Sequence, residues 1–212
     1  MQRIETGIRN FDNQIEGGIP HGETVLIEGE PGAGKTNFGI EFLYRGAMED
    51  QNGLFVSFQE TEDEILRTTT FDWDFEEYVE SGTINIRKMN AYRYEEVADM
   101  LRGMIKVNEA ERIVLDPITD LDLYIDSRKD IRKTLLSIKK EVRNSEATAL
   151  MLAETGEATS IEEEIADGIV DMIVEEDGKE VQRKLYIRKL KGSDYNQNVH
   201  NYSLDSKGLK VQ

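Results

Sequence analysis

Short apolar runs alternate with amphipathic stretches along most of this chain of 212 residues. We expect strands where the apolar, partly β-branched runs lie, at 24–28, 54–58, 83–87, 112–116 and 148–153. Helical patterns lie between them, at 38–47, 61–69, 94–106 and 128–144. Alternation of this kind predicts an α/β fold in which helices cover both faces of a mostly parallel sheet.

The C-terminal part of the chain has a different pattern. Residues 169–174 are apolar, Asp177-Gly178 is a hairpin-turn signal, and 181–189 alternates apolar with polar side chains. Short strand-like runs follow at 199–204 and 208–211. These features predict an antiparallel extension of the parallel sheet. Because no Pro/Gly/Ser-rich linker or internal repeat interrupts the chain, we expect one domain over residues 1–212.

Residues 29–36 read Gly-Glu-Pro-Gly-Ala-Gly-Lys-Thr, a complete G-x-x-x-x-G-K-T motif between a predicted strand and a predicted helix. Glycines let the backbone turn tightly, so that successive N–H groups converge on a phosphate, and the helix that follows adds its positive dipole end. Lys35 can reach the β- and γ-phosphates, and the Thr36 hydroxyl can ligate Mg²⁺. The motif therefore predicts binding of a nucleoside triphosphate.

The strand predicted at 112–116 ends in a carboxylate, Asp116. Ligands of doubly wound sheets bind beyond the carboxyl ends of the strands, which places Asp116 beside the phosphate loop. Mg²⁺ keeps several waters and uses few protein ligands, so Thr36 and Asp116 are the candidate metal residues.

Composition narrows the possible partners. The chain contains no cysteine, which excludes disulfides and thiolate metal sites, and no run of 18 apolar residues, which argues against membrane insertion. Its formal net charge is −17, so long-range repulsion disfavours nucleic acid as the main partner. We expect a soluble, cytoplasmic protein whose ATP binding depends on local features of the loop.

Other candidate features have a structural and a functional interpretation. The acidic clusters 162–164 and 175–177 are expected to be solvated surface or hairpin rim, with metal binding as the minor alternative. Phe71 and Trp73 are able to stack on adenine, but a core role at a helix end is at least as plausible.

Several motifs, in this order, resemble the RecA superfamily and especially its KaiC-like ATPases. They are Glu16–Gly22 before the loop, Phe55–Thr61 (Phe-Val-Ser-Phe-Gln-Glu-Thr), Phe71–Asp74 and Lys189–Ser193. The resemblance runs from about Ile4 to Val211 and corresponds to a single KaiC-type domain. It implies a RecA-like P-loop NTPase fold, with ATP and Mg²⁺ as cofactors.

The resemblance also implies roles for individual residues. Nucleotide contacts are expected from Gly29, Gly32, Ala33, Gly34, Lys35, Thr36, Asn37 and Thr70. Contacts to the nucleotide of a neighbouring subunit are expected from Lys189, Leu190, Lys191, Ser193, Asp205 and Ser206. Such contacts in trans imply self-association into a ring, usually a hexamer, with ATP at each interface. A cation from the neighbouring subunit would stabilise charge on the γ-phosphate.

The chain departs from the family pattern at three positions. KaiC-like domains usually have two adjacent glutamates where this chain has Gln59-Glu60, and glutamine cannot accept a proton from water at neutral pH. Pro117 replaces a common serine, and Lys191 replaces a frequent arginine. The catalytic candidates are Lys35, Glu60 and Gln59, and we expect weak ATPase activity with intact ATP binding. The alternatives are a non-hydrolysing ATP sensor that scaffolds an unknown partner machine, and a recombination ATPase acting on DNA.

Overall fold

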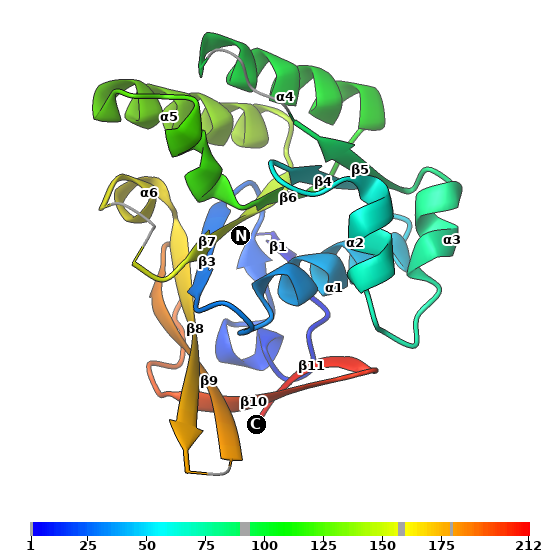
Figure 1. Cartoon of the computed structure of the whole chain (residues 1–212), viewed down its shortest axis with the longest axis vertical. Coiled ribbons are helices and arrows are strands. Elements are labelled where there is room, and N and C mark those ends of the chain that lie inside the picture. Colours follow the sequence, from blue (N-terminus) through cyan, green and yellow to red (C-terminus); the bar gives the residue numbers. More distant parts are fainter. Residues whose placement is uncertain (1, 90–93, 157–159, 179) are drawn as a thin grey trace.

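A nine-stranded sheet runs through the molecule in the order β11-β10-β9-β8-β3-β7-β6-β4-β5 (Figure 1). The computed structural model describes residues 2–89, 94–156, 160–178 and 180–212. The parallel strands, in their spatial order, are β8 (Gly168–Asp177), β3 (Thr24–Gly29), β7 (Thr148–Glu154), β6 (Arg112–Asp116), β4 (Gly53–Ser57) and β5 (Ile84–Lys88). The mostly parallel sheet expected from the sequence is confirmed.

The C-terminal strands continue the sheet in antiparallel pairing. They are β9 (Glu180–Leu190), β10 (His200–Asp205) and β11 (Gly208–Val211). Asp177 pairs with residue 180, so the hairpin turn falls at the predicted dipeptide, where Gly178 has a φ of 66°. The predicted antiparallel extension is therefore present. A separate two-stranded piece near the N-terminus joins β1 (Arg3–Ile4) to β2 (Ile19–Pro20).

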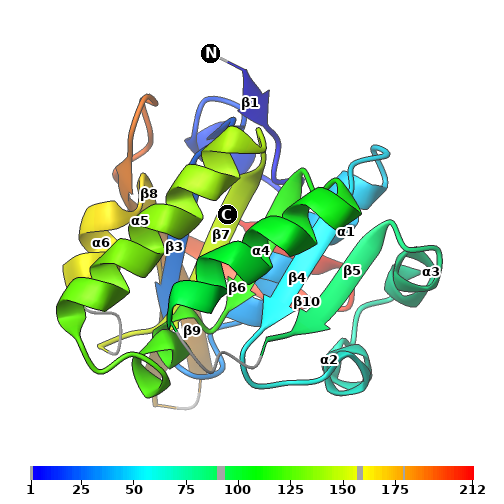
Figure 2. The same ribbon diagram turned by 90° about the horizontal axis from the view of Figure 1, so that it is seen from above.

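Helices cover both faces of the sheet (Figure 2). They are α1 (Lys35–Ala47), α2 (Glu62–Thr68), α3 (Phe75–Glu80), α4 (Tyr94–Asn108), α5 (Arg128–Asn144) and α6 (Ser160–Ile165). The described residues also form two 3₁₀ segments, Asp12–Gln14 and Ile118–Leu123. Among the described residues, no helix is both long and apolar enough to cross a membrane.

Alternate strand residues enter two separate cores because successive side chains of a strand point to opposite faces. Val114 packs in the core that contains α1, whereas its neighbours Ile113 and Leu115 pack in the core that contains α4 and α5. Strands buried on both faces are apolar at nearly every position, which explains why they were recognisable as continuous runs.

One sequence expectation about polar surface is wrong. The cluster at 162–164 was expected to be solvated, but Glu162 is 1% exposed on α6. Consecutive residues of a helix point about 100° apart, so three adjacent glutamates spread over more than half of the helix circumference, and on α6 the side of Glu162 is buried. Glu163 and Glu164 do lie on the outside, where they pair with Arg188 and Arg132.

Candidate functional site

The glycine-rich loop connects β3, which is buried along its whole length, to the first turn of α1. Gly32 has a φ of 81° and Gly34, the N-cap of α1, has a φ of 92°. Residues with a Cβ rarely adopt this left-handed conformation, so glycine is required at both turns. The loop thereby wraps around the N-terminus of α1, where backbone N–H groups and the helix dipole favour an anion.

The side chain of Lys35 lies over this loop. Its Nζ donates hydrogen bonds to the carbonyl oxygens of Gly29, at 2.8 Å, and Glu30, at 3.1 Å. The residue is 9% exposed, so its charge acts in a partly desolvated setting. The ammonium group is thus held at the mouth of the loop, within reach of a phosphate chain bound there.

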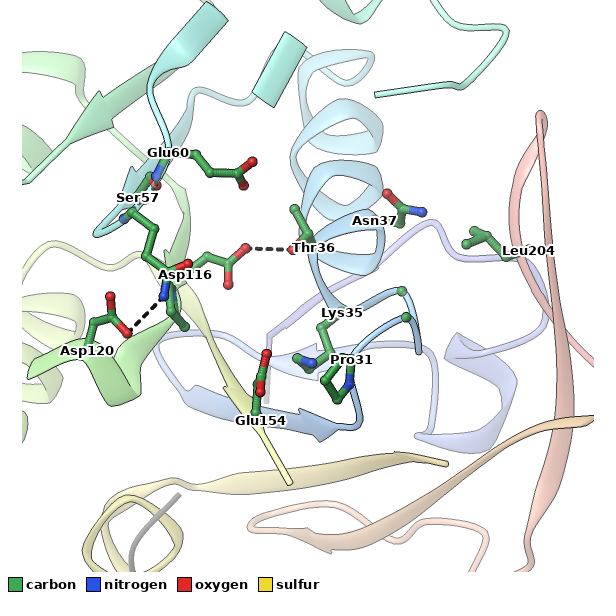
Figure 3. Close-up of a pocket in the computed structure, with 14 residues that line it drawn as sticks. Pro31, Lys35, Thr36, Asn37, Ser57, Glu60, Asp116, Asp120, Glu154 and Leu204 are labelled. Atoms are coloured by element: carbon green, nitrogen blue, oxygen red, sulfur yellow. Dashed lines mark hydrogen bonds between the residues drawn. The ribbon is translucent and has the colours of Figure 1, made fainter. Parts of the chain in front are cut away.

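Thr36 and Asp116 come together from α1 and the end of β6. The Thr36 hydroxyl donates to Oδ2 of Asp116 at 2.8 Å (Figure 3). Burial raises the pKa of Asp116 to about 6, while the Thr36 hydrogen bond and the charge of Lys35 act in the opposite direction. Asp116 is therefore mostly ionised at neutral pH and presents a carboxylate to the site.

These groups line one pocket of about 510 Å³ at the carboxyl edge of the sheet. Strands β3 and β7 end in register there, as do β4 and β6, because Gly29 pairs with Glu154 and Ser57 pairs with Asp116. The predicted site residues that line the pocket are Gly32, Gly34, Lys35, Thr36, Asn37, Gln59, Glu60 and Asp116. The fold thus brings together these eight predicted residues, which are up to 84 positions apart in the sequence, from Gly32 to Asp116.

Gln59 and Glu60 both reach this pocket because β4 has already ended at Ser57. The Ser57 hydroxyl accepts hydrogen bonds from the backbone N–H groups of Gln59, at 3.3 Å, and Glu60, at 2.8 Å. This local turn removes the strict alternation of a strand, so adjacent side chains can face the same cavity. The amide of Gln59 donates to Asp120 at 3.1 Å.

The pocket is also lined by residues that the sequence analysis did not assign to the site, namely Pro31, Ser57, Pro117, Asp120, Glu154 and Leu204. Glu154 ends β7, next to the loop strand, and Figure 3 shows its carboxylate beside Lys35. The rule that led to Asp116 would also have led to Glu154, since both end parallel strands. No comparable signal exists for Leu204, because β10 reaches the pocket only through the packing of the C-terminal strands.

Other predicted contacts lie outside the pocket-lining set. Gly29 is the last residue of β3, Ala33 is fully buried behind the loop, and Thr70 is exposed between α2 and α3. Nucleotide contacts from these three residues stay predictions. Trp73 stacks on Tyr44, with ring centroids 4.7 Å apart, and on Phe71, at 3.9 Å, so the core interpretation of this pair is the one that the structure supports.

The basic segment expected to act in trans lies at the opposite edge of the sheet. Leu190 pairs with Gly168, which in turn pairs with Val25 at the start of β3. Lys189 donates to the carbonyl of Glu163 at 2.9 Å and to that of Ala166 at 2.6 Å. The length of the parallel sheet separates Lys189, Leu190 and Lys191 from the phosphate loop of their own chain.

The remaining residues expected in trans lie in two other places. Ser193 accepts a hydrogen bond from Arg3. Asp205 accepts one from Arg9 at 3.3 Å, and the carbonyl of Ser206 accepts one from the N–H of Asp72 at 2.8 Å. Because Leu204 lines the pocket, the turn at Asp205 and Ser206 lies close to the chain's own site. Contacts of these residues to a neighbouring subunit stay predictions.

A loop of this shape, at the switch from a buried strand to a helix, is how α/β proteins hold the phosphates of a nucleotide. The pocket places the chain in the class of P-loop nucleotide-binding proteins. The family model described as "ATPase: KaiC" matches residues 4–212. This chain belongs to the KaiC family of ATPases, which supports nucleotide binding and ATPase activity and confirms the resemblance seen in its motifs.

Individual relatives agree with the family assignment. A UPF0273 protein of Pyrococcus horikoshii is 28% identical, over 99% of this chain and 94% of the relative. The circadian clock oscillator protein KaiC of Synechococcus elongatus is 26% identical, over 100% of this chain but only 44% of the clock protein. The crystal structure of a KaiC-like protein from Pyrococcus horikoshii matches with a TM-score of 0.89 and 31% identity, over 100% of this chain and 99% of that one. The RecA-like fold is thereby confirmed.

Proposed function

We propose that this protein binds Mg-ATP and hydrolyses it slowly, as a single KaiC-type domain that acts as a nucleotide-dependent switch. The observation that carries the proposal is the meeting of Lys35 and the two loop glycines with the Thr36–Asp116 pair in one pocket. Amides, an ammonium group and a helix N-terminus together offset the charge of a triphosphate. They do so locally, within a chain whose net charge is −17.

The residues at the Thr36–Asp116 pair fit a magnesium ion. A hydroxyl and a mostly ionised carboxylate, 2.8 Å apart, are hard oxygen donors of the kind that Mg²⁺ uses in small number. Thr36 would ligate the ion and Asp116 would hold its water shell, while the ion would neutralise charge on the phosphates. Four carboxylates line the pocket (Glu60, Asp116, Asp120 and Glu154), which makes such neutralisation necessary for ATP to bind.

The arrangement of Gln59 and Glu60 supports slow turnover. The amide of Gln59 is able to orient a water molecule but not to accept its proton, and it is engaged with Asp120. Glu60 follows Gln59 directly in the sequence, and its carboxylate faces the same cavity (Figure 3). We propose that Glu60 assists the attacking water, with Lys35 stabilising charge on the transferred phosphoryl group.

Calorimetry with Mg-ATP, paired with a phosphate-release assay on the same sample, tests this function. We expect saturable heat of binding in the wild type and a loss of affinity of at least about tenfold in Lys35→Ala, because a charge-assisted contact to phosphate is removed. Lys184→Ala is the matched control, since Lys184 pairs with Glu175 in the hairpin far from the pocket. A folded wild type without heat of binding would overturn the proposal.

We further propose that copies of this chain assemble into a ring, with a hexamer as the expected size. Lys189 and Lys191 lie at the amino edge of the sheet and the pocket lies at its carboxyl edge. A head-to-tail contact would bring one edge against the other, as cyclic assemblies require. The self-association of the KaiC family is consistent with this arrangement.

The second candidate is an ATP sensor that does not hydrolyse its ligand and scaffolds a partner machine. The observation in its favour is that the Gln59 amide, which cannot act as a base, donates its hydrogen bond to Asp120. The paired assay separates the two functions. Tight Mg-ATP binding with no phosphate release above the Lys35→Ala background would favour the sensor, whereas measurable turnover by the isolated protein would favour the slow ATPase.

A further inference from the structure

The C-terminal strand pair touches the phosphate loop of its own chain. Tyr202, on β10, is 4% exposed, and its hydroxyl donates a hydrogen bond to the carbonyl oxygen of Ala33 at 2.6 Å. Leu204, two residues further along the same strand, lines the pocket next to Gly34, where a Cβ on the glycine would lie 3.2 Å from the leucine Cδ2. Burial raises the pKa of Tyr202 to about 12, so the phenol stays protonated and remains a donor at any physiological pH.

The carbonyl that Tyr202 holds shares a peptide plane with the N–H of Gly34. The Ala33–Gly34 bond is trans, since the one cis bond found among the described residues is Asp116–Pro117. In a trans peptide the C=O and the N–H point in opposite directions. A carbonyl anchored by the Tyr202 hydroxyl therefore fixes the Gly34 amide on the opposite side of that peptide, and Gly34 itself lines the pocket.

The position of Gly34 makes this direction important. Gly34 is the N-cap of α1 and has a φ of 92°, a conformation that glycine adopts without the steric cost of a Cβ. Within the described part of the chain, no hydrogen bond from its N–H is found. The Ala33–Gly34 peptide is therefore held from its carbonyl side, by the contact with Tyr202 outside the loop.

The strand pair is also held to α1 independently of Tyr202. The N–H of Leu209, on β11, donates to Oε2 of Glu41 at 2.6 Å, and Glu41 is fully buried on α1. Arg45 pairs with the other carboxylate oxygen of Glu41 at 3.1 Å. Removal of the Tyr202 hydroxyl therefore leaves the strands in place and isolates the effect of one hydrogen bond on the loop.

We propose that Tyr202 is a positioning residue for the nucleotide site, which orients the Ala33–Gly34 peptide so that the Gly34 amide faces the β-phosphate of a bound nucleotide. This inference rests on the proposed binding of nucleotide at the loop. It assigns to the end of the chain a part in phosphate recognition that the loop motif alone does not contain. A preorganised amide costs no reorganisation when the anion binds, which is the source of the expected gain in affinity.

The test compares Tyr202→Phe with Tyr195→Phe. Both substitutions remove a hydroxyl that donates to a backbone carbonyl, but Tyr195 donates to Arg188 at 3.2 Å, outside the pocket. We expect the Kd for Mg-ADP, measured by calorimetry, to rise about five- to tenfold in Tyr202→Phe, the usual range for one neutral hydrogen bond, and to stay unchanged in Tyr195→Phe. The ³¹P resonance of the β-phosphate of bound ADP should shift in Tyr202→Phe, while that of the α-phosphate should not.

A purely structural role of the hydroxyl would give a different pattern. Tyr202→Phe would then lower the melting temperature of the nucleotide-free protein but bind Mg-ADP with the wild-type Kd and the wild-type β-phosphate resonance, and this result would overturn the proposal. Hydrogen exchange on the wild type provides a measurement that needs no variant. Exchange of the Gly34 amide should slow when Mg-ADP is bound, and an unchanged rate in the bound protein contradicts the assignment. A wild type that binds no Mg-ADP at all would instead refute the proposed function.

Discussion

Side chains at the ends of three neighbouring strands set the chemistry that this pocket can perform. Ser57 ends β4, Asp116 ends β6 and Glu154 ends β7. The turn that Ser57 stabilises brings Gln59 and Glu60 to the same cavity. The amide of Gln59 therefore lies beside the carboxylate of Glu60, in a pocket that Asp116, Asp120 and Glu154 also line. Each carboxylate in this pocket is able to accept a proton from water, but each also repels the phosphates of a nucleotide.

Replacement of Gln59 by glutamate should raise the rate of phosphate release. A carboxylate at this position is able to accept a proton from the attacking water, an effect that general-base catalysis typically makes worth about 10²-fold or more. We expect steady-state phosphate release at saturating Mg-ATP to increase by at least about tenfold. Lys35→Ala defines the background. Fast turnover in the wild type that falls in Gln59→Glu would contradict this view of the site.

Replacement of Glu154 by glutamine should strengthen the binding of ATP. The carboxylate lies beside Lys35 in the pocket (Figure 3) and repels a triphosphate, so its removal favours the anion. We expect the Kd for Mg-ATP to fall about threefold to tenfold at low salt, with a smaller difference at 0.5 M salt because charges at a partly open site are screened. Glu176→Gln, on the exposed part of β8, is the control. A loss of turnover instead of a gain in affinity would assign Glu154 to catalysis.

At the scale of elements, α5 links the sheet to its neighbouring helices. Its apolar stripe of Ile131, Leu135, Ile138 and Val142 is buried, and Glu141 accepts two hydrogen bonds of 2.8 Å from Arg102 on α4. From the same helix, Lys139 pairs with Asp167, which is 1% exposed between α6 and β8. The basic segment after β9 joins this cluster through the contact of Lys191 with Asp167 at 3.3 Å.

The Asp167 cluster should stabilise the fold in a pH-dependent way. Burial acts to raise the pKa of Asp167, but the pairs with the charged Lys139 and Lys191 outweigh it and hold the pKa at about 2, below the ordinary value of 3.8. A carboxyl whose pKa is lower in the folded than in the unfolded state stabilises the fold above the unfolded value. This contribution is lost as the pH falls through the folded value.

Replacement of Asp167 by asparagine tests that contribution. We expect the free energy of unfolding in urea at pH 7 to fall by about 3 kcal/mol, since the buried charge of Lys139 loses its partner. The difference from the wild type should shrink as the pH falls from 4 toward 2. Asp130→Asn, which removes an exposed pair with Lys133 at 2.9 Å, should change the free energy of unfolding far less, because solvent screens the pair. A pH-independent difference would show that the charge of Asp167 is not the cause.

At the scale of the whole molecule, the two edges of the sheet have different chemical characters. The carboxyl edge holds the pocket with its four carboxylates, and the amino edge carries Lys189 and Lys191. A chain with a net charge of −17 repels its own copies, so an assembly needs either salt or a contact of opposite charges. A bound nucleotide, which concentrates negative charge at one edge, would supply that contact.

Assembly should therefore depend on nucleotide and on Lys191. We expect mass measurement in solution to show a species of about six chains with Mg-ATP and smaller species without it. Lys191→Ala should lower the assembled fraction severalfold at the same nucleotide concentration, whereas Lys106→Ala, at an exposed position on α4, should not. An identical mass with and without Mg-ATP would contradict the nucleotide-dependent switch.

Much of the sheet was predictable from local patterns. The strand at 112–116, the helix at 128–144 and the strand at 208–211 have the predicted bounds. Short elements were missed, among them α3 and α6, because six residues span less than two helical turns and show no periodicity of their own. Glu162 was misassigned for the same reason, since its burial depends on a short helix that the sequence pattern does not show.

The sequence by itself determined the strand and helix alternation, the shape of the phosphate loop and the pairing of that loop with Asp116, because each follows from spacing and from the edge at which parallel strands end. Only the tertiary structure decided which distant groups complete the pocket. Glu154 reaches it because β7 lies beside β3. Leu204 reaches it, and Tyr202 reaches the loop carbonyl of Ala33, because the antiparallel strands continue the sheet and pack against α1. Such contacts arise from the packing of whole elements, and a local sequence pattern does not show which distant elements pack together.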